Sequence, residues 1–193
     1  MPVELSKGHP IFEKAEAARV SIKKAKVEDV NAAVYMACDF SGSMSGYYSN
    51  GTMQDLTERV LGLSARFDDD GLVPVFLFDT GVRKPVNVDV NRPAGAMAEI
   101  VRKAGRMGGT NYAPAIKAIR EYHRKHGNGA PGFVVFQTDG DTYPASETEQ
   151  AIRDAEQDPM FWQFVGYGAE EKAFLNKLNK MERSYIDNAG YFP

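Results

Sequence analysis

Residues 32–45 read AAVYMACDFSGSMS, a mostly apolar run that ends in an acid, hydroxyl side chains and glycines. A short apolar run closed by turn residues predicts a buried β-strand. Just past its end, Asp39, Ser41 and Ser43 place three oxygen-bearing side chains at alternate positions. Ligands of α/β proteins bind beyond the carboxyl ends of the strands. We therefore expect this loop to hold a divalent cation.

Size and composition are those of an ordinary globular domain. The 193 residues are enough for one domain with a full core, and the apolar (43%) and charged (25%) shares are typical of globular proteins. A net charge of -3 without a dense basic stretch argues against nucleic-acid binding. The apolar runs are too short to span a bilayer, and residues 1–8 lack the apolar core of a signal peptide. We expect neither a nucleic-acid nor a membrane partner.

The single cysteine, Cys38, rules out an internal disulfide and fits a reducing cytosol. We therefore expect a cytoplasmic protein. Cys38 directly precedes Asp39, and we interpret it as a small buried residue at the end of the strand. A nucleophilic cysteine would want a nearby histidine, and none of His9, His123 and His126 lies in a motif.

Apolar runs and helical stripes alternate along the rest of the chain. The alternation of apolar and polar residues over 82–90 predicts a short antiparallel strand, and Pro85 favours an edge over a central position in the sheet. The alternation predicts an α/β fold in which a mostly parallel sheet has helices on both faces. We expect one domain over residues 32–193, preceded by an extended lead-in, residues 1–31, that packs on it. The further buried strands are predicted at 72–78, 133–138 and 161–166, and the helices at 52–67, 94–104, 114–125, 146–156 and 170–181.

Several local signals refine these boundaries. Thr52 is a predicted N-cap, and Ser146 with Glu149 has the spacing of a capping box. We expect a last short strand at 184–187 and a docked tail at 188–193. Three acids at 68–70 could suggest calcium, but without more ligands at set spacing we interpret them as a solvated turn.

Two more loops carry oxygen-bearing side chains. Thr110 follows Gly108 and Gly109 just before a predicted helix, and Asp139 follows the predicted strand 133–138. Loops after parallel strands lie at one edge of the sheet, so Asp39 and Asp139 can meet although about 100 residues separate them. Hydroxyls with few carboxylates favour a hard cation, Mg²⁺, Mn²⁺ or Ca²⁺, rather than zinc. Because neutral ligands do not balance the charge of such a metal, we expect it to bind an anion from another molecule. The simplest such anion is the Asp or Glu carboxylate of a protein partner.

The order and spacing of these pieces resemble the metal-ion-dependent adhesion site (MIDAS) of von Willebrand factor A (vWA) domains. A finer match resembles the intracellular branch found in tellurium-resistance and stress proteins (TerF-like), which is related to copine A domains. It covers most of the chain through LSKG (5–8), NGT (50–52), FDDDG (67–71), VFLFDTG (75–81), GGTNYAP (108–114), FWQFVG (161–166) and DNA (187–189).

The resemblance implies a three-layer αβα, Rossmann-like vWA fold and a function as an interaction module, not an enzyme. It also implies that Ser41, Ser43 and Thr110 ligate the metal directly, while Asp39 and Asp139 act mainly through water. Mg²⁺ is the expected cation, with Ca²⁺ or Mn²⁺ as alternatives. The implied setting is a bacterial tellurium-resistance or stress-response system.

Two other functions remain open from the sequence. In a Mg²⁺-dependent phosphohydrolase of the haloacid-dehalogenase type, Asp39 would be the nucleophile, but Ser41 stands where a second Asp is usual. The other is a scaffold subunit with a silent metal site. The sequence leaves the oligomeric state unknown, and Asp141 either adds charge beside the site or faces water. Tyr47 and Tyr48 form a surface flap, which we favour, or a contact patch.

Overall fold

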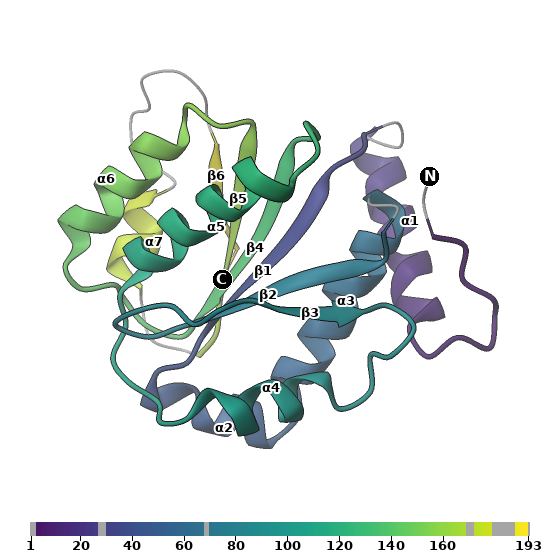
Figure 1. Ribbon diagram of the computed structural model, residues 1–193, viewed down its shortest axis with the longest axis horizontal. Helices are drawn as coiled ribbons and strands as arrows, with labels where there is room; N and C mark the ends of the chain where they lie inside the picture. The colour runs from purple at the N-terminus through teal and green to yellow at the C-terminus, as the bar shows by residue number, and fades with distance from the viewer. Residues whose placement is uncertain (1–2, 27–29, 68–69, 169–171, 179–187, 193) are drawn as a thin grey trace.

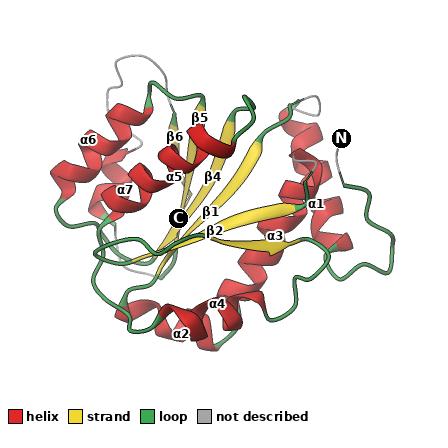
Figure 2. Ribbon diagram, viewed as in Figure 1, coloured by secondary structure: helices red, strands yellow, loops and turns green. Residues whose placement is uncertain are grey.

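The computed structural model describes residues 3–26, 30–67, 70–168, 172–178 and 188–192 (Figure 1). Among these residues lies a six-stranded sheet of order β3-β2-β1-β4-β5-β6 (Figure 2). All pairings are parallel except β2 with β3, which is the antiparallel edge strand that the sequence predicted. The strands are β1 Ala33–Asp39, β2 Leu72–Phe78, β3 Val86–Asp89, β4 Gly132–Thr138, β5 Met160–Gly166 and β6 Ala189–Phe192.

Helices cover both faces of the sheet, so the predicted three-layer α/β architecture is confirmed (Figure 1). One face carries α5, α6 and α7, and the other carries α3 and α4 with α1 outside α3. None of the helices in the described ranges combines the length and the apolar character needed to cross a membrane. The helices are α1 Phe12–Ala25, α2 Ser45–Ser49, α3 Thr52–Phe67, α4 Ala96–Ala104, α5 Tyr112–His126, α6 Ala145–Ala155 and α7 Ala173–Leu178, with a 3-10 turn at Gly42–Met44.

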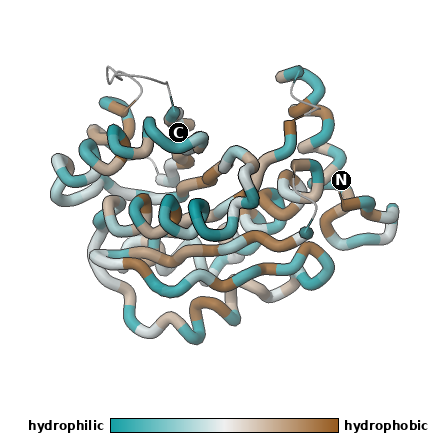
Figure 3. Tube along the Cα trace, turned by 45° about the horizontal axis from the view of Figure 1, so that its top comes forward, coloured by the Kyte–Doolittle hydropathy of each residue, from teal (hydrophilic) through white to brown (hydrophobic). Residues whose placement is uncertain are grey.

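The sheet separates two hydrophobic cores, and β1 contributes to both. Tyr35 and Ala37 point into the core under α5 and α6, whereas Val34, Met36 and Cys38 point into the core under α3 and α4. Successive side chains of a strand alternate between faces, so a strand buried on both sides must be apolar throughout. Hydrophobic segments accordingly run along the central strands (Figure 3). Cys38 is buried as interpreted, and this burial raises the pKa of its thiol.

The extended conformation predicted for residues 1–31 is wrong over Phe12–Ala25, which form α1. Ala15 and Ile22 of this helix are buried, as is Ile11 just before it, and the helix packs against α3. The contact is close, because a Cβ atom added to Gly62 of α3 would lie 2.9 Å from the backbone nitrogen of Ala15. A helix approaches another this closely only where a side chain is missing. The division into a lead-in and a domain from residue 32 stays a prediction.

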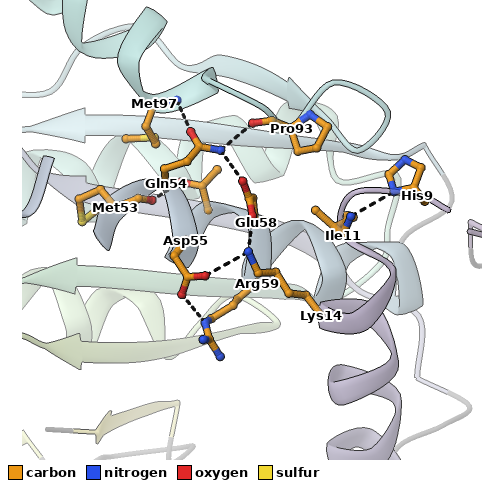
Figure 4. A network of polar contacts seen from close by, with 11 residues as sticks. His9, Ile11, Lys14, Met53, Gln54, Asp55, Glu58, Arg59, Pro93 and Met97 are labelled. Atoms are coloured by element: carbon orange, nitrogen blue, oxygen red, sulfur yellow. Dashed lines mark hydrogen bonds and ion pairs between the residues drawn. The ribbon is translucent and has the colours of Figure 1, made fainter. Parts of the chain in front are cut away.

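Polar contacts also hold α1 and α4 against α3 (Figure 4). Lys14 of α1 forms ion pairs with Glu58 and, at 3.0 Å, with Asp55. Gln54 of α3 accepts a hydrogen bond from the backbone N–H of Met97 (3.1 Å) and donates one to a carbonyl in the turn before α4 (2.7 Å). Gln54 therefore fixes where α4 begins.

Some predicted boundaries need correction. Thr52 is the first residue of α3 rather than its cap, and the carbonyl of Gly51 accepts from the N–H of Asp55 (3.0 Å). The side-chain oxygen of Asn50 accepts from the N–H of Thr52 (3.0 Å) just before the helix. The predicted capping box is wrong, because α6 begins at Ala145 and Ser146 already lies within its first turn. The predicted tail contains a sixth strand, β6, parallel to β5. The strand predicted at 184–187 lies outside the described residues, as do 170, 171 and 179–181 of the last predicted helix.

Candidate metal centre

Asp39, the last residue of β1, is the buried anchor of the candidate site. Its side chain has no exposed surface, and both of its carboxylate oxygens accept hydrogen bonds. Oδ1 accepts from the backbone N–H of Ser41 (2.8 Å), and Oδ2 accepts from the hydroxyl of Thr138 on the neighbouring strand (2.6 Å). These bonds fix the carboxylate and the start of the loop after β1.

A chain of hydrogen bonds continues from this loop to the loop after β4. The Ser41 and Ser43 hydroxyl oxygens lie 3.1 Å apart, and the Ser43 hydroxyl donates to Oδ1 of Asp139 (2.8 Å). Ser43 is exposed, so the chain leads from the buried Asp39 to solvent. The structure therefore brings together four of the five predicted residues through direct contacts.

Backbone contacts of the loop that carries Thr110, the fifth residue, place it at the same edge of the sheet. Gly108 forms an isolated parallel bridge with Ser41, through two backbone hydrogen bonds of 3.2 Å each. The carbonyl of Thr110 accepts from the N–H of Tyr143 in the loop after β4 (2.9 Å). Within the described part of the chain, the Thr110 hydroxyl makes no hydrogen bond. The loop that carries this hydroxyl contacts the loops after β1 and β4 through its backbone.

Arg83 fastens the loop that carries Thr110. Its guanidinium donates to Oδ2 of Asp79 at the end of β2 (2.9 Å). It also donates to the backbone carbonyls of Ala104 and Arg106, each at 2.9 Å. Three hydrogen bonds from one planar side chain hold the segment after α4 against the end of β2.

Burial dominates the electrostatics of Asp39. Removal from water raises the pKa of its carboxyl to about 6, although the hydrogen bonds from Thr138 and Ser41 act in the opposite direction. The negative charge of Asp139 is a smaller contribution to this rise. A nearby cation favours the ionised form of a carboxylate, so a metal would relieve the cost of this charge.

Gln137, Thr138 and Tyr48 support Asp39, a role that the sequence did not predict for them. Thr138 bonds the Asp39 carboxylate, and the side-chain oxygen of Gln137 accepts from the Asp39 N–H (3.2 Å). The hydroxyl of Tyr48 donates to the Asp39 carbonyl (2.7 Å), and burial keeps this hydroxyl protonated by raising its pKa well above the ordinary value. A polar side chain at the very end of an apolar strand is the signal that could have identified Gln137 and Thr138.

The structure also answers the questions left open around the site. Tyr48 packs edge-on against Phe40, and Tyr47 packs against Tyr167, so the flap interpretation is wrong for both. Asp141 accepts from the backbone N–H groups of Ala173 (3.1 Å) and Phe174 (3.0 Å) and so caps α7.

The acidic turn at 68–70 is described only at Asp70. Its carboxylate accepts from the N–H of Leu72 (2.7 Å), a local contact that stabilises a turn. Asp68 and Asp69 lie outside the described residues.

The donor set suits a hard divalent cation. The side chains that converge offer hydroxyl and carboxylate oxygens, which Mg²⁺, Mn²⁺ and Ca²⁺ prefer. No group of three or more His, Cys, Asp or Glu side chains able to hold a metal occurs in the described ranges. Hydroxyl oxygens, such as those of Ser41, Ser43 and Thr110, are the further donors at this edge of the sheet.

Comparison with known proteins identifies the family. The family model vWA-TerF-like, described as the vWA found in the TerF C terminus, matches residues 31–193. This chain belongs to the vWA-TerF-like family. A curated relative, the uncharacterized protein YcbR of Bacillus subtilis (strain 168), is 32% identical over 181 residues, which cover 91% of this chain and 73% of YcbR.

Solved structures confirm the vWA fold. Manganese-loaded TRAP protein of Plasmodium vivax superposes with a TM-score of 0.61 at 16% identity, over 84% of this chain and 68% of TRAP. Proximal thread matrix protein 1 of the mussel byssus, with a zinc-occupied MIDAS motif, has a TM-score of 0.50 at 15% identity, over 91% of this chain and 47% of that chain. The chain spans less than half the length of several solved vWA proteins that it matches, such as 39% of the one from Catenulispora acidiphila.

Proposed function

We propose that this vWA-TerF-like chain is a metal-ion-dependent protein-interaction module. The hydroxyls of Ser41, Ser43 and Thr110 would hold a divalent cation directly, and Asp39 and Asp139 would act mainly through water. The bound cation would supply an electrophilic site for the Asp or Glu carboxylate of a protein partner. The observation that carries this proposal is the hydrogen-bonded chain from buried Asp39 through the two serines to Asp139.

Two structural relatives support the metal. TRAP was solved loaded with manganese, and the mussel protein was solved with zinc in its MIDAS motif. Mg²⁺ is our first choice for this chain, with Ca²⁺ and Mn²⁺ as alternatives, because the donors are oxygens and Mg²⁺ binds few carboxylates while keeping several waters.

An exposed aromatic side chain supports a protein partner. Tyr143 is 83% exposed, and its backbone is fixed to the carbonyl of Thr110 (2.9 Å). A tyrosine offers a large contact area with few rotatable bonds, and tyrosines are enriched among the residues that dominate protein interfaces. A small anion would reach the metal without such a residue beside it.

The geometry favours an interaction module over a phosphohydrolase. The attacking carboxylate of a haloacid-dehalogenase-type enzyme must reach a phosphate, as any covalent nucleophile must reach its substrate. Asp39 is fully buried, and both of its oxygens already accept hydrogen bonds. Ser41 cannot act as the acid two residues later, because its hydroxyl does not ionise near neutral pH.

The biological setting that we propose is a bacterial tellurium-resistance or stress-response system in the cytoplasm. The family model takes its name from TerF, and the curated relative YcbR comes from a bacterium. The single cysteine, buried at the end of β1, suits a reducing compartment.

Affinity capture from the native host tests this proposal. The full chain is immobilised, and captured proteins are quantified by mass spectrometry in Mg²⁺ and in EDTA. We expect partners that bind in Mg²⁺, leave in EDTA and are lost with the double variant Ser43→Ala/Thr110→Ala. Ser21→Ala, which removes an exposed hydroxyl from α1, is the matched control and should capture the same partners. Capture that is equal in EDTA and with the double variant would contradict the proposal.

A further inference from the structure

An apolar groove lies beside the candidate metal centre, between α2 and α4. Its volume is about 370 Å³. Two methionines, Met97 and Met107, are among its lining residues, and such flexible, polarisable side chains adapt to different apolar partners. We call it the α2–α4 groove, and it is lined by Ser45, Tyr48, Ser49, Met97, Ala98, Val101, Arg102 and Met107.

Both walls of the groove are continuous with the loops of the metal centre. One wall, α2, begins at Ser45, two residues after Ser43, and contains Tyr48, whose hydroxyl bonds the Asp39 carbonyl (2.7 Å). On the other side, Met107 directly precedes Gly108, which bridges to Ser41. A peptide that placed an acid on the metal could therefore continue directly into the groove.

The second wall is rigid. The first turn of α4 is bonded to Gln54 through the N–H of Met97 (3.1 Å), and Gln54 also donates to the carbonyl of Pro93 (2.7 Å), as Figure 4 shows. Met97 itself is buried in the core under α3, so the floor of the groove is part of the folded domain. A preformed groove costs little ordering energy when a partner binds.

The charge at the rim matches an acidic partner. Arg102 lines the groove and is exposed, and Arg106 is exposed in the loop that follows. Within the described ranges, neither guanidinium has an ion-pair partner within 4.0 Å, whereas the neighbouring Lys103 pairs with Glu99 (2.6 Å). Besides the hydrogen bond from Lys103, the charge of Arg102 helps to lower the pKa of Glu99, but a guanidinium without a direct ion pair beside an apolar surface can still bind a carboxylate of an incoming chain.

We infer that the α2–α4 groove selects the partner by its sequence around the metal-bound acid. The partner is a peptide segment whose acid is accompanied by an aliphatic residue for the groove and by a second acid for Arg102. This inference rests on the proposed function, since the metal supplies the first contact. The groove adds a second recognition site, so that the chain would bind a partner through more than one carboxylate.

Selection of random peptides tests the inference. A phage-displayed library of random peptides is bound to the full chain in Mg²⁺ and eluted with EDTA, and the eluted pool is sequenced. With the wild type we expect acids accompanied by Leu, Ile, Met or Phe and by a second acid, enriched about tenfold over the input, as one buried aliphatic side chain allows.

Three variants separate the contributions. Ala98→Trp fills the groove from an exposed position, so EDTA-eluted peptides should keep the acid and lose the aliphatic preference. Arg102→Glu should remove the preference for the second acid. Ala17→Trp, at an exposed position on α1 outside this groove, is the matched control and should select the same peptides as the wild type.

The outcomes distinguish this inference from the proposed function. EDTA-eluted peptides with an acid but without aliphatic enrichment, or an unchanged preference in Ala98→Trp, would overturn the groove alone. A wild-type chain from which EDTA elutes no enriched peptides would overturn the metal-dependent interaction and the groove with it.

Discussion

The ionisable carboxyl group of Asp39 is buried away from water. Its pKa in the folded chain is about 6, against an ordinary value of 3.8, and burial is the largest cause. The folded state therefore binds the proton more tightly than the unfolded state. The stabilising contribution of the protonated carboxyl is fully present below about pH 3.8 and is lost as the pH rises through about 6.

Removal of this buried charge should stabilise the metal-free chain. Asp39→Asn keeps an oxygen for the Ser41 N–H and removes the buried charge, so we expect it to be more stable than the wild type at neutral pH by about 1–3 kcal/mol. Urea denaturation in EDTA measures the difference, which should shrink as the pH falls toward 4. A variant that is less stable at neutral pH, or a difference independent of pH, would show that burial does not destabilise the Asp39 charge.

The second prediction concerns the tyrosine that holds the loop after β1. Tyr48→Phe removes the hydrogen bond to the Asp39 carbonyl (2.7 Å), and we expect a loss of about 1 kcal/mol in the free energy of unfolding. Tyr47→Phe is the matched control, because the ring contact of Tyr47 with Tyr167 survives the change. Chemical denaturation of both variants measures the effect. Equal losses would argue that the Tyr48 hydroxyl has no special part in the site.

The sequence pattern points to the candidate ligands but not to the supporting residues that hydrogen-bond to Asp39. Asp39, Ser41 and Ser43 stand at alternate positions, and such spacing is visible in one dimension. Thr138 contacts Asp39 only because β1 and β4 pair with Cys38 opposite Gln137, which places the next residues side by side. That register is set by the whole sheet, so no local pattern reveals it.

Among the elements, the contact between α1 and α3 depends on one glycine. A Cβ atom at Gly62 would lie 2.9 Å from two backbone atoms of α1, which cannot move aside as a side chain can. Gly62→Ala should therefore separate the helices and cost about 2 kcal/mol, although alanine favours a helix by about 1 kcal/mol. Gly46→Ala in α2, where nothing lies within 4 Å of the added carbon, should be neutral or stabilising. Thermal unfolding of both variants checks this, and a harmless Gly62→Ala would refute the close contact.

The elements that were predicted correctly and those that were missed differ in their apolar content. β1 and β2 are nearly continuous apolar runs because both of their faces are buried, and such runs are conspicuous. In α1 only Ala15 and Ile22 are buried among many charged residues, so its helical period is weak. The strand β6 has only four residues, too few for an alternating pattern to stand out. It is recognised by its hydrogen-bonded pairing with β5 in the folded chain.

At the scale of the whole molecule, the candidate metal centre belongs to the global fold. Its residues come from three loops that meet only when the two cores have formed on opposite faces of the sheet. A cation that binds only the assembled site stabilises the folded state by about 2.7 kcal/mol at a hundred times its dissociation constant. Metal binding should therefore appear in the unfolding of the entire domain.

Thermal unfolding of the full chain against Mg²⁺ concentration tests the central claim most directly. We expect the midpoint temperature of the wild type to rise steadily with the logarithm of the Mg²⁺ concentration and to return to its starting value in EDTA. In Ser43→Ala/Thr110→Ala the midpoint should not respond to Mg²⁺, while Ser49→Ala should follow the wild type. A wild-type midpoint that ignores Mg²⁺, Mn²⁺ and Ca²⁺ alike, or an equal rise in the double variant, would contradict a divalent cation held by these hydroxyls.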